Sequence, residues 1–172
     1  MRKVLIVVDM QNDFITGALG STEAQAIVPN VIEKVKNFEG EILFTRDTHY
    51  KDNYFATLEG DKLPVLHCVE NTYGWQIIEE LNPYIKHSAN IIDKFTFGYE
   101  DWNEAFDSID LEFELCGVCT DICVVSNALA LRMFYPDAKI TVDASCCAGV
   151  TPEKHAAALE VMKSCQIEVI NE

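Results

Sequence analysis

The stretch Leu111–Asn127, which reads LEFELCGVCTDICVVSN, decides the fold of this chain. Its first part, Leu111–Leu115, is an apolar run that alternates with glutamates and predicts a strand, and Gly117 predicts a turn after it. Thr120 then predicts the N-cap of a helix that continues through the apolar segment Ile122–Leu131. A strand, a tight turn and a helix in this order present a reactive group at the carboxyl end of a sheet.

Cys123 falls in the first turn of this predicted helix, where the backbone N–H groups lack intrahelical partners. The positive end of the helix dipole favours the thiolate over the thiol at this position. Cys123 is therefore the candidate nucleophile, while Cys116 and Cys119 are poorer candidates because neither lies inside the first helical turn. The C-x2-C-x3-C spacing of these cysteines matches neither a closed zinc site, which needs four ligands, nor the bacterial iron–sulfur run.

Length and composition limit the class of protein. The 172 residues predict one domain that spans residues 1–172, and the net charge of −15 argues against binding to nucleic acid or to an anionic membrane surface. No apolar run reaches the roughly 18 residues of a membrane span, and the apolar stretch after Met1-Arg2-Lys3 is too short for a signal peptide. We therefore expect a cytoplasmic protein whose seven cysteines are reduced and mostly buried.

Apolar runs alternate with helical patterns along the rest of the chain. The other predicted strands are Val4–Val8, Glu41–Thr45, Asn90–Asp93, Ile140–Val142 and Gln166–Ile170. The other predicted helices are Val28–Phe38, Trp75–Leu81, Glu100–Phe106 and a last one that starts at Pro152 after an N-cap at Thr151 and runs to about Ser164. This order predicts an α/β fold with a doubly wound, mainly parallel six-stranded sheet flanked by helices in three layers.

Two more chemically useful residues follow predicted strands. Val4–Val8 ends at Asp9, which either faces a ligand or caps a turn, and the residues alone favour neither reading. Lys94 follows the third predicted strand, and in a surface loop it would simply be solvated. Because the carboxyl ends of parallel strands meet at one edge of the sheet, Lys94 would gain a role if it lay near Asp9 and Cys123.

A long polar segment without periodicity, Asp47–Asn71, separates the second strand from the next elements. Connections of this length in a compact domain tend to be functional. The segment holds four metal-binding side chains, namely Asp47, His49, Glu59 and His67. Carboxylate and imidazole together suit zinc, iron or manganese, and Asp-x-His places two ligands on one side of an extended chain. The alternative, which the spacing leaves open, is a solvated loop with incidental histidines.

Five motifs in order carry a resemblance to a known family, and they read VVDMQNDF, TRDTH, LPVLHC, IDKFTFG and GVCTDICV. In this combination the chain resembles the isochorismatase-like cysteine hydrolases, and among them most closely the nicotinamidases and pyrazinamidases. The resemblance implies that Cys123 is the nucleophile, Asp9 the general base and acid, and Lys94 the third member of a triad. It also implies a cis peptide bond between Val118 and Cys119, which would aim the N–H groups of Cys119 and Cys123 into an oxyanion hole.

The same resemblance implies one divalent metal ion, with zinc expected first and iron or manganese as alternatives. The ligands that it implies are Asp47, His49, His67 and Glu59. The fourth ligand varies within the family, so Asp52 and Asp61 remain rivals of Glu59. The two other histidines, His87 and His155, are expected at the surface.

For the substrate, the resemblance matches Phe14 to an aromatic residue that packs on the ring. Trp75, Phe97 and Tyr99 are further candidates, and each could equally be a core or surface aromatic. The implied reaction deamidates nicotinamide, and also pyrazinamide, through a thioester, in NAD salvage. A small amide is then the partner. The sequence leaves the oligomeric state open between a monomer and a homo-oligomer, although members of the family commonly associate. The competing readings are a metal-free amidase of the same fold that acts on a carbamoyl or ureido compound, and a non-enzymatic member with the cysteines as core.

Overall fold

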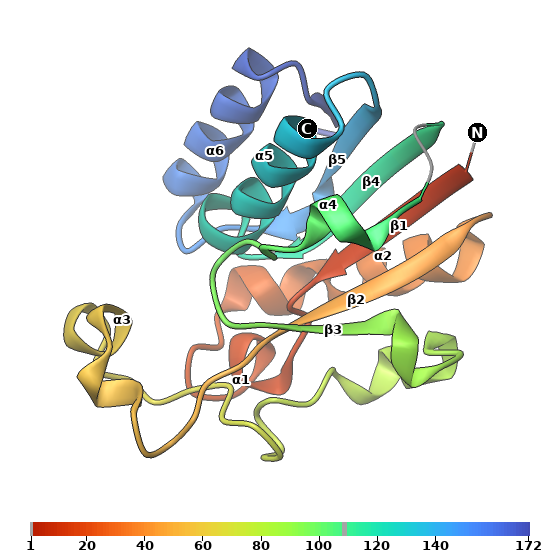
Figure 1. The fold of residues 1–172 in the computed structure, drawn as a ribbon. Helices are drawn as coiled ribbons and strands as arrows, with labels where there is room; N and C mark the ends of the chain where they lie inside the picture. Colours follow the sequence, from red (N-terminus) through yellow and green to blue (C-terminus); the bar gives the residue numbers. More distant parts are fainter. Residues whose placement is uncertain (1, 108–109) are drawn as a thin grey trace.

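The computed structural model describes residues 2–107 and 110–172, and its centre is a six-stranded sheet (Figure 1). The strands are β1 (Arg2–Val8), β2 (Glu41–Asp47), β3 (Ile91–Lys94), β4 (Leu111–Val118), β5 (Lys139–Ala148) and β6 (Glu168–Ile170). They pair in parallel in the order β3-β2-β1-β4-β5-β6. The predicted doubly wound parallel sheet is therefore confirmed, and its strand order reverses between β1 and β4.

The two central strands are the most apolar, as the sequence pattern requires of strands covered on both faces. Every residue from Val4 to Val8 in β1 is at most 1% exposed, and Phe113 and Leu115 of β4 are fully buried. β1 and β4 pair along their whole length, from Arg2 beside Leu111 onward. Their carboxyl ends therefore reach the same edge, where parallel sheets bind ligands.

Helices cover both faces of the sheet, with α2 behind it and α4, α5 and α6 in front of it in Figure 1. The α-helices are α1 (Asn12–Ile15), α2 (Thr22–Asn37), α3 (Leu58–Lys62), α4 (Trp102–Ala105), α5 (Val125–Phe134) and α6 (Pro152–Ser164). Shorter turns are the 3₁₀ helices η1 (Tyr54–Ala56), η2 (Glu79–Tyr84) and η3 (Ser88–Asn90) and the π-helix η4 (Thr120–Val124). The three predicted layers are thus present.

Three predicted helices differ from the structure. The helix expected over Val28–Phe38 begins earlier, at Thr22, because the hydroxyl of Ser21 accepts a hydrogen bond from the N–H of Ala24 and caps it. The helix expected over Glu100–Phe106 is only the single turn of α4.

The helix predicted over Trp75–Leu81 is wrong. Ile77 forms an antiparallel bridge with Gln11, and the N–H of Ile78 donates to the carbonyl of Met10. The apolar spacing of this segment therefore reflects side chains buried against the chain after β1, and a 3₁₀ helix forms only from Glu79 onward.

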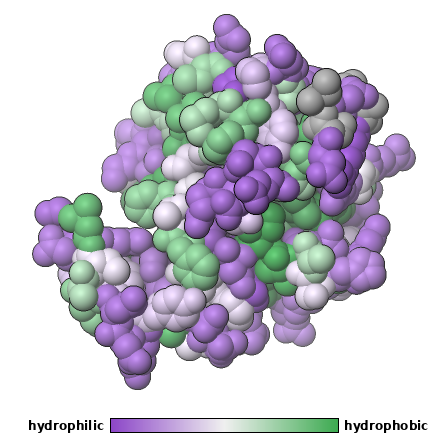
Figure 2. Space-filling view, in the orientation of Figure 1, coloured by the Kyte–Doolittle hydropathy of each residue, from purple (hydrophilic) through white to green (hydrophobic). Residues whose placement is uncertain are grey.

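The outer surface agrees with the acidic composition. Figure 2 shows many hydrophilic residues on one face, interspersed with hydrophobic ones. Exposed hydrophobic side chains include Phe55 of η1 and Leu58 of α3. Within the described ranges, no helix combines the length and the apolar character that crossing a membrane requires.

Candidate active site

Asp9, Lys94 and Cys123 meet at the carboxyl edge of the sheet. Nζ of Lys94 lies 2.7 Å from Oδ2 of Asp9 and 3.5 Å from Sγ of Cys123. Asp9 and Lys94 are fully buried, and Cys123 is 5% exposed. These side chains come from the end of β1, the end of β3 and η4, so residues distant in the chain form one acid, amine and thiol cluster. The structure brings together the three residues that the sequence singled out.

The Asp9 carboxylate is held from the neighbouring strand β2. Asp9 has a left-handed backbone, with φ of 50°, and the hydroxyl of Thr45 donates to its Oδ1 at 2.6 Å. Burial raises the pKa of Asp9, and although the Lys94 ammonium lowers it in part, the pKa stays above its ordinary value. A carboxyl group with a raised pKa is a better proton acceptor than an exposed one.

Lys94 is a cation in this cluster. Burial lowers the pKa of Lys94, but Asp9, Cys123 and Asp47 outweigh the burial and raise the pKa above its ordinary value. The carbonyl of Thr96 accepts a further hydrogen bond from Nζ at 3.3 Å. The ammonium is therefore fixed between two carboxylates and the sulfur.

The expectation that the site favours a Cys123 thiolate is not met. Burial and the Asp9 carboxylate raise the pKa of Cys123 well above its ordinary value, and Lys94 offsets only part of this. This direction favours the thiol over the thiolate, with the buried Asp9 carboxylate as its neighbour.

Thr120 is not the N-cap that the sequence predicted. It lies inside the π-helical turn η4, and its hydroxyl shares a 2.8 Å hydrogen bond with Nδ1 of His155 in α6. Cys123 also belongs to η4, and the α-helix starts only at Val125. The hydroxyl thus finds a partner on α6 instead of a backbone N–H, and Cys123 precedes the first α-helical turn.

The turn before Cys123 has the cis peptide bond between Val118 and Cys119 that the resemblance implied. Gly117 precedes it with φ of 119°, and a Cβ there would lie 2.1 Å from the carbonyl oxygen of Val8. Glycine is therefore required where β4 passes β1. The assignment of the Cys119 and Cys123 N–H groups to an oxyanion hole stays a prediction.

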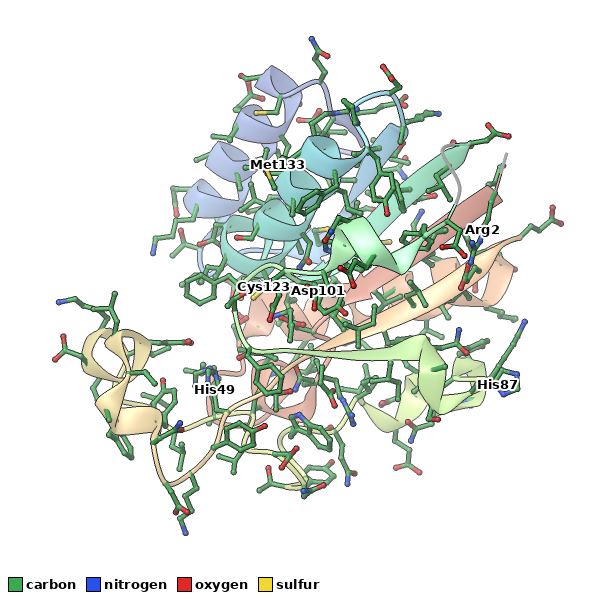
Figure 3. The ribbon with its side chains drawn as sticks, in the orientation of Figure 1. Arg2, His49, His87, Asp101, Cys123 and Met133 are labelled. Carbon is green, nitrogen blue, oxygen red and sulfur yellow. The ribbon has the colours of Figure 1, made fainter. Side chains whose placement is uncertain are left out.

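A second cluster lies beside the triad and contains the four predicted metal ligands, Asp47, His49, Glu59 and His67. We call these residues the ligand group, and one ligand atom from each lies within 4.8 Å of all the others. Nε2 of His49 is 2.9 Å from Oδ2 of Asp47 and 3.7 Å from Oε1 of Glu59. Nε2 of His67 is 3.5 Å and 3.6 Å from the same two oxygens. Figure 3 shows His49 on the chain that leads from β2 to α3, with Cys123 at the base of α5.

These spacings fit a divalent ion. Ligands at zinc bond lengths in a tetrahedron lie about 3.3 Å apart, close to the four separations measured here. Two imidazoles and two carboxylates also suit iron or manganese. Nδ1 of His67 lies 2.7 Å from the carbonyl oxygen of Val65, and this bond leaves Nε2 free to coordinate. Asp52 and Asp61, the rival ligands, are exposed and lie outside the group.

Asp47 connects the two clusters. Its Oδ2 faces both histidines, and its Oδ1 lies 3.6 Å from Nζ of Lys94. Burial raises the pKa of Asp47, but hydrogen bonds with the histidines and the charge of Lys94 hold it below its ordinary value. Asp47 is therefore an anion, as a metal ligand must be.

The candidate aromatic residues have different surroundings. The ring of Phe14 lies 5.6 Å from that of His67, next to the ligand group. Phe97 is 47% exposed, and Tyr99 is half-buried with its ring edge-on to Trp102. Trp75 is buried, with its ring over the Arg46 guanidinium and its N–H donating to Thr48. A role for each in substrate binding stays a prediction.

Sequence reasoning missed the polar residues that hold these groups in place. The Gln11 side chain accepts from the N–H of Asp47 and donates to its carbonyl oxygen and to that of Trp75. Asn127 makes four hydrogen bonds beside Cys123. The one signal in the sequence was an amide inside an otherwise apolar pattern. His87 is exposed as expected, whereas His155 is half-buried.

Comparison with known proteins agrees with this architecture. The family model described as the Isochorismatase domain matches residues 3–172. The nicotinamidase of Schizosaccharomyces pombe is 25% identical over 207 residues, which cover 98% of this chain and 92% of that protein.

Two solved structures are similar over their whole length. The crystal structure of the nicotinamidase/pyrazinamidase of Bacillus subtilis superposes with a TM-score of 0.85 at 26% identity, covering 99% of this chain and 100% of that one. The crystal structure of the pyrazinamidase of Pyrococcus horikoshii in complex with zinc gives a TM-score of 0.81 at 28% identity, with full coverage of both chains.

Proposed function

The chain belongs to the isochorismatase family, and from that membership we propose that it is a metal-dependent cysteine amidohydrolase that converts nicotinamide to nicotinate and ammonia. Its similarity to nicotinamidases and pyrazinamidases shows an amidohydrolase, and we include pyrazinamide in the proposal as a second substrate. The proposal depends above all on one observation, the position of Lys94 Nζ between the Asp9 carboxylate and the Cys123 sulfur.

In the proposed reaction Cys123 is the nucleophile and Asp9 receives its proton. The Cys123 thiol gives its proton to the Asp9 carboxylate as the sulfur attacks the amide carbon. The raised pKa of Cys123 opposes a preformed thiolate, and the raised pKa of Asp9 makes its carboxylate the better proton acceptor. The Lys94 ammonium stabilises the negative charge that forms on the sulfur. We assign the N–H groups of Cys119 and Cys123 to the oxyanion.

Asp9 then completes both halves of the reaction. Its proton goes to the amide nitrogen as the C–N bond breaks, which releases ammonia and leaves a thioester on Cys123. The Asp9 carboxylate next takes a proton from water, whose oxygen attacks the thioester carbon. The C–S bond breaks, the carboxylic acid leaves, and the proton on Asp9 returns to the Cys123 sulfur.

We assign the ligand group to one divalent ion, with zinc first. When bound, the ion would contact the pyridine nitrogen and so position the ring. Asp47, His49, Glu59 and His67 would hold the ion, and their measured spacing supports this assignment. Phe14, next to His67, would pack against the ring.

The proposed setting is NAD salvage in the cytoplasm. The seven free cysteines support a reducing compartment. A homo-oligomer and the absence of nucleic-acid and membrane partners stay predictions.

The test is an assay of the purified protein with nicotinamide, in which ammonia and nicotinate are both quantified and the metal content is measured. We expect equal amounts of the two products and about one ion per chain, with activity lost on chelation and restored by added zinc. Hydrolysis of carbamoyl or ureido compounds by metal-free protein, without action on nicotinamide, would replace this proposal with a metal-free amidase. No amide hydrolysis at all would leave a non-enzymatic member of the fold.

A further inference from the structure

Asn127 is a fully buried residue on α5 that the reaction proposed above does not use. Its Nδ2 donates to the carbonyl oxygen of Cys123 at 2.8 Å and to that of Phe97 at 3.3 Å. Its Oδ1 accepts from the N–H of Tyr99 and from the indole N–H of Trp102, both at 2.9 Å. Both amide hydrogens and both acceptor positions of the side chain are therefore used.

These bonds connect two separate parts of the site. One partner is the backbone of Cys123, and the other three belong to residues 97–102, which we call the wall segment. The wall segment follows Lys94 and Thr96 and contains two of the candidate ring contacts, Phe97 and Tyr99.

The wall segment also contacts the start of α5 directly. A Cβ added at Gly98 would lie 3.2 Å from the carbonyl oxygen of Ser126, so the two backbones are in close contact. Ser126 is three residues after the nucleophile. The amide of Asn127 is therefore placed where a small shift changes the distance between the wall segment and Cys123.

We propose that Asn127 is a positioning residue that clamps the wall segment to the Cys123 turn and thereby sets substrate affinity. Its contacts supply no reacting group, so the effect on the reaction is indirect. Holding a substrate wall against a nucleophile is a positioning effect, and a displacement of about 1 Å can cost about a hundredfold in rate. The kinetic part of this inference rests on the proposed hydrolysis of nicotinamide.

Two substitutions separate the clamp from general damage to the fold. Asn127→Leu is close in size and removes all four hydrogen bonds. Asn127→Asp keeps an oxygen that can accept from Tyr99 and Trp102. The matched control is Arg132→Met on the same helix. Arg132 donates to the carbonyls of Pro136, Ala138 and Gln166, and among the described residues none of these partners belongs to the site.

For Asn127→Leu we expect KM for nicotinamide to rise about tenfold relative to Arg132→Met, measured at a temperature where both are folded. Asn127→Asp should recover at least about a third of that loss because it retains the acceptor. The chain has two tryptophans, Trp75 and Trp102, so the indole N–H resonances report the clamp directly. The chemical shift of one indole N–H should change in Asn127→Leu, and both chemical shifts should be unchanged in Arg132→Met.

Equal KM values for Asn127→Leu and Arg132→Met would overturn the proposal. If the Leu variant does not fold, Asn127→Asp decides, because it loses the hydrogen bonds to the carbonyls of Cys123 and Phe97: a KM equal to that of Arg132→Met would overturn the proposal. If the wild type does not hydrolyse nicotinamide, the proposed function fails, and the clamp is then judged by alkylation of Cys123 with iodoacetamide, followed by peptide mass spectrometry. We expect about threefold faster alkylation in Asn127→Leu than in the wild type and Arg132→Met, because the wall segment is released, and equal rates would contradict the clamp.

Discussion

Asp47 Oδ1 lies 3.6 Å from Lys94 Nζ, so one buried carboxylate borders the triad and also belongs to the ligand group. This relationship links the two clusters electrostatically. An ion bound by Asp47 would withdraw negative charge from Lys94, and Asp9 would then be the main counter-charge of the ammonium. Whether an ion occupies the ligand group should therefore change the electrostatic environment of Cys123.

The first prediction concerns the identity of the nucleophile. Cys123→Ala should abolish ammonia release from nicotinamide, because it removes the only sulfur within hydrogen-bonding distance of Lys94 among the described residues. Cys119→Ala should retain activity within about tenfold, since its proposed role uses the backbone N–H. Ammonia release by both variants is the measurement, and an equal loss would contradict this division of roles.

The second prediction concerns the fourth ligand. Glu59→Gln should weaken metal binding about tenfold to a hundredfold, because it replaces a carboxylate of the ligand group by a neutral amide. Asp61→Asn on the same helix is the matched control, since the Asp61 side chain is 69% exposed and outside the group. Titration of metal-depleted protein with zinc measures both affinities. A similar affinity for the two variants would exclude Glu59 as a ligand.

The third prediction concerns the buried ammonium. Lys94→Met should lower the free energy of unfolding by about 3 kcal/mol or more, because the buried Asp9 and Asp47 lose their cation. It should also remove activity. Lys139→Met is the control, since among the described residues Lys139 pairs with Glu112 and Glu168 and its own side chain is 55% exposed, so its unfolding midpoint should hardly move. Urea unfolding of the three proteins at pH 7 measures the difference.

The fourth prediction concerns stability and pH. Lys34 on α2 forms ion pairs with Glu114 and with Asp143, the latter at 2.7 Å. Burial raises the pKa of Asp143, but Lys34 and Ser145 outweigh it and hold the pKa below its ordinary value. The same pairs raise the pKa of Lys34 above its ordinary range, although burial alone would lower it.

The sign of the effect follows from these directions. The Asp143 contribution is fully present above about pH 4 and is lost as the pH falls through the lowered folded pKa, while that of Lys34 is lost only above about pH 10. The difference in unfolding free energy between wild type and Asp143→Asn should therefore be constant from about pH 5 to 9 and shrink below about pH 4. Urea unfolding across this range measures it. A difference that grows on acidification would contradict the ion-pair explanation.

The sheet and the convergence of the triad residues could be predicted because buried apolar runs identify strands. Because Asp9 and Lys94 each follow a predicted strand and the strands are parallel, both residues lie at the carboxyl edge of the sheet for any conformation of the loops. The turn around Thr120 could not be predicted, since its hydroxyl bonds to His155 on α6, a contact that appears only when the helices pack. At this turn the tertiary contact with α6, and not the local capping preference of threonine, determines the hydrogen bond of the Thr120 hydroxyl.

The helix prediction for the segment around Ile77 was wrong for a similar reason. Its apolar spacing imitates a helix, but the bridge to Gln11 fixes an extended backbone. The supporting roles of the Gln11 and Asn127 side-chain amides could not be predicted either, because a buried amide is recognised only from its hydrogen-bond partners in the folded structure. The sheet and the chemical groups of the site could thus be inferred from the sequence, and the hydrogen bonds that hold those groups in place could not.

Three of the four residues in the ligand group, His49, Glu59 and His67, come from a single excursion of the chain between β2 and η2, whereas the triad draws on strands from across the sheet. The proposed ion site is in this sense modular. Replacing that one segment would remove three of the four proposed ion ligands at once and leave Asp9, Lys94 and Cys123 on their own elements, so the proposed metal and the proposed triad can change independently.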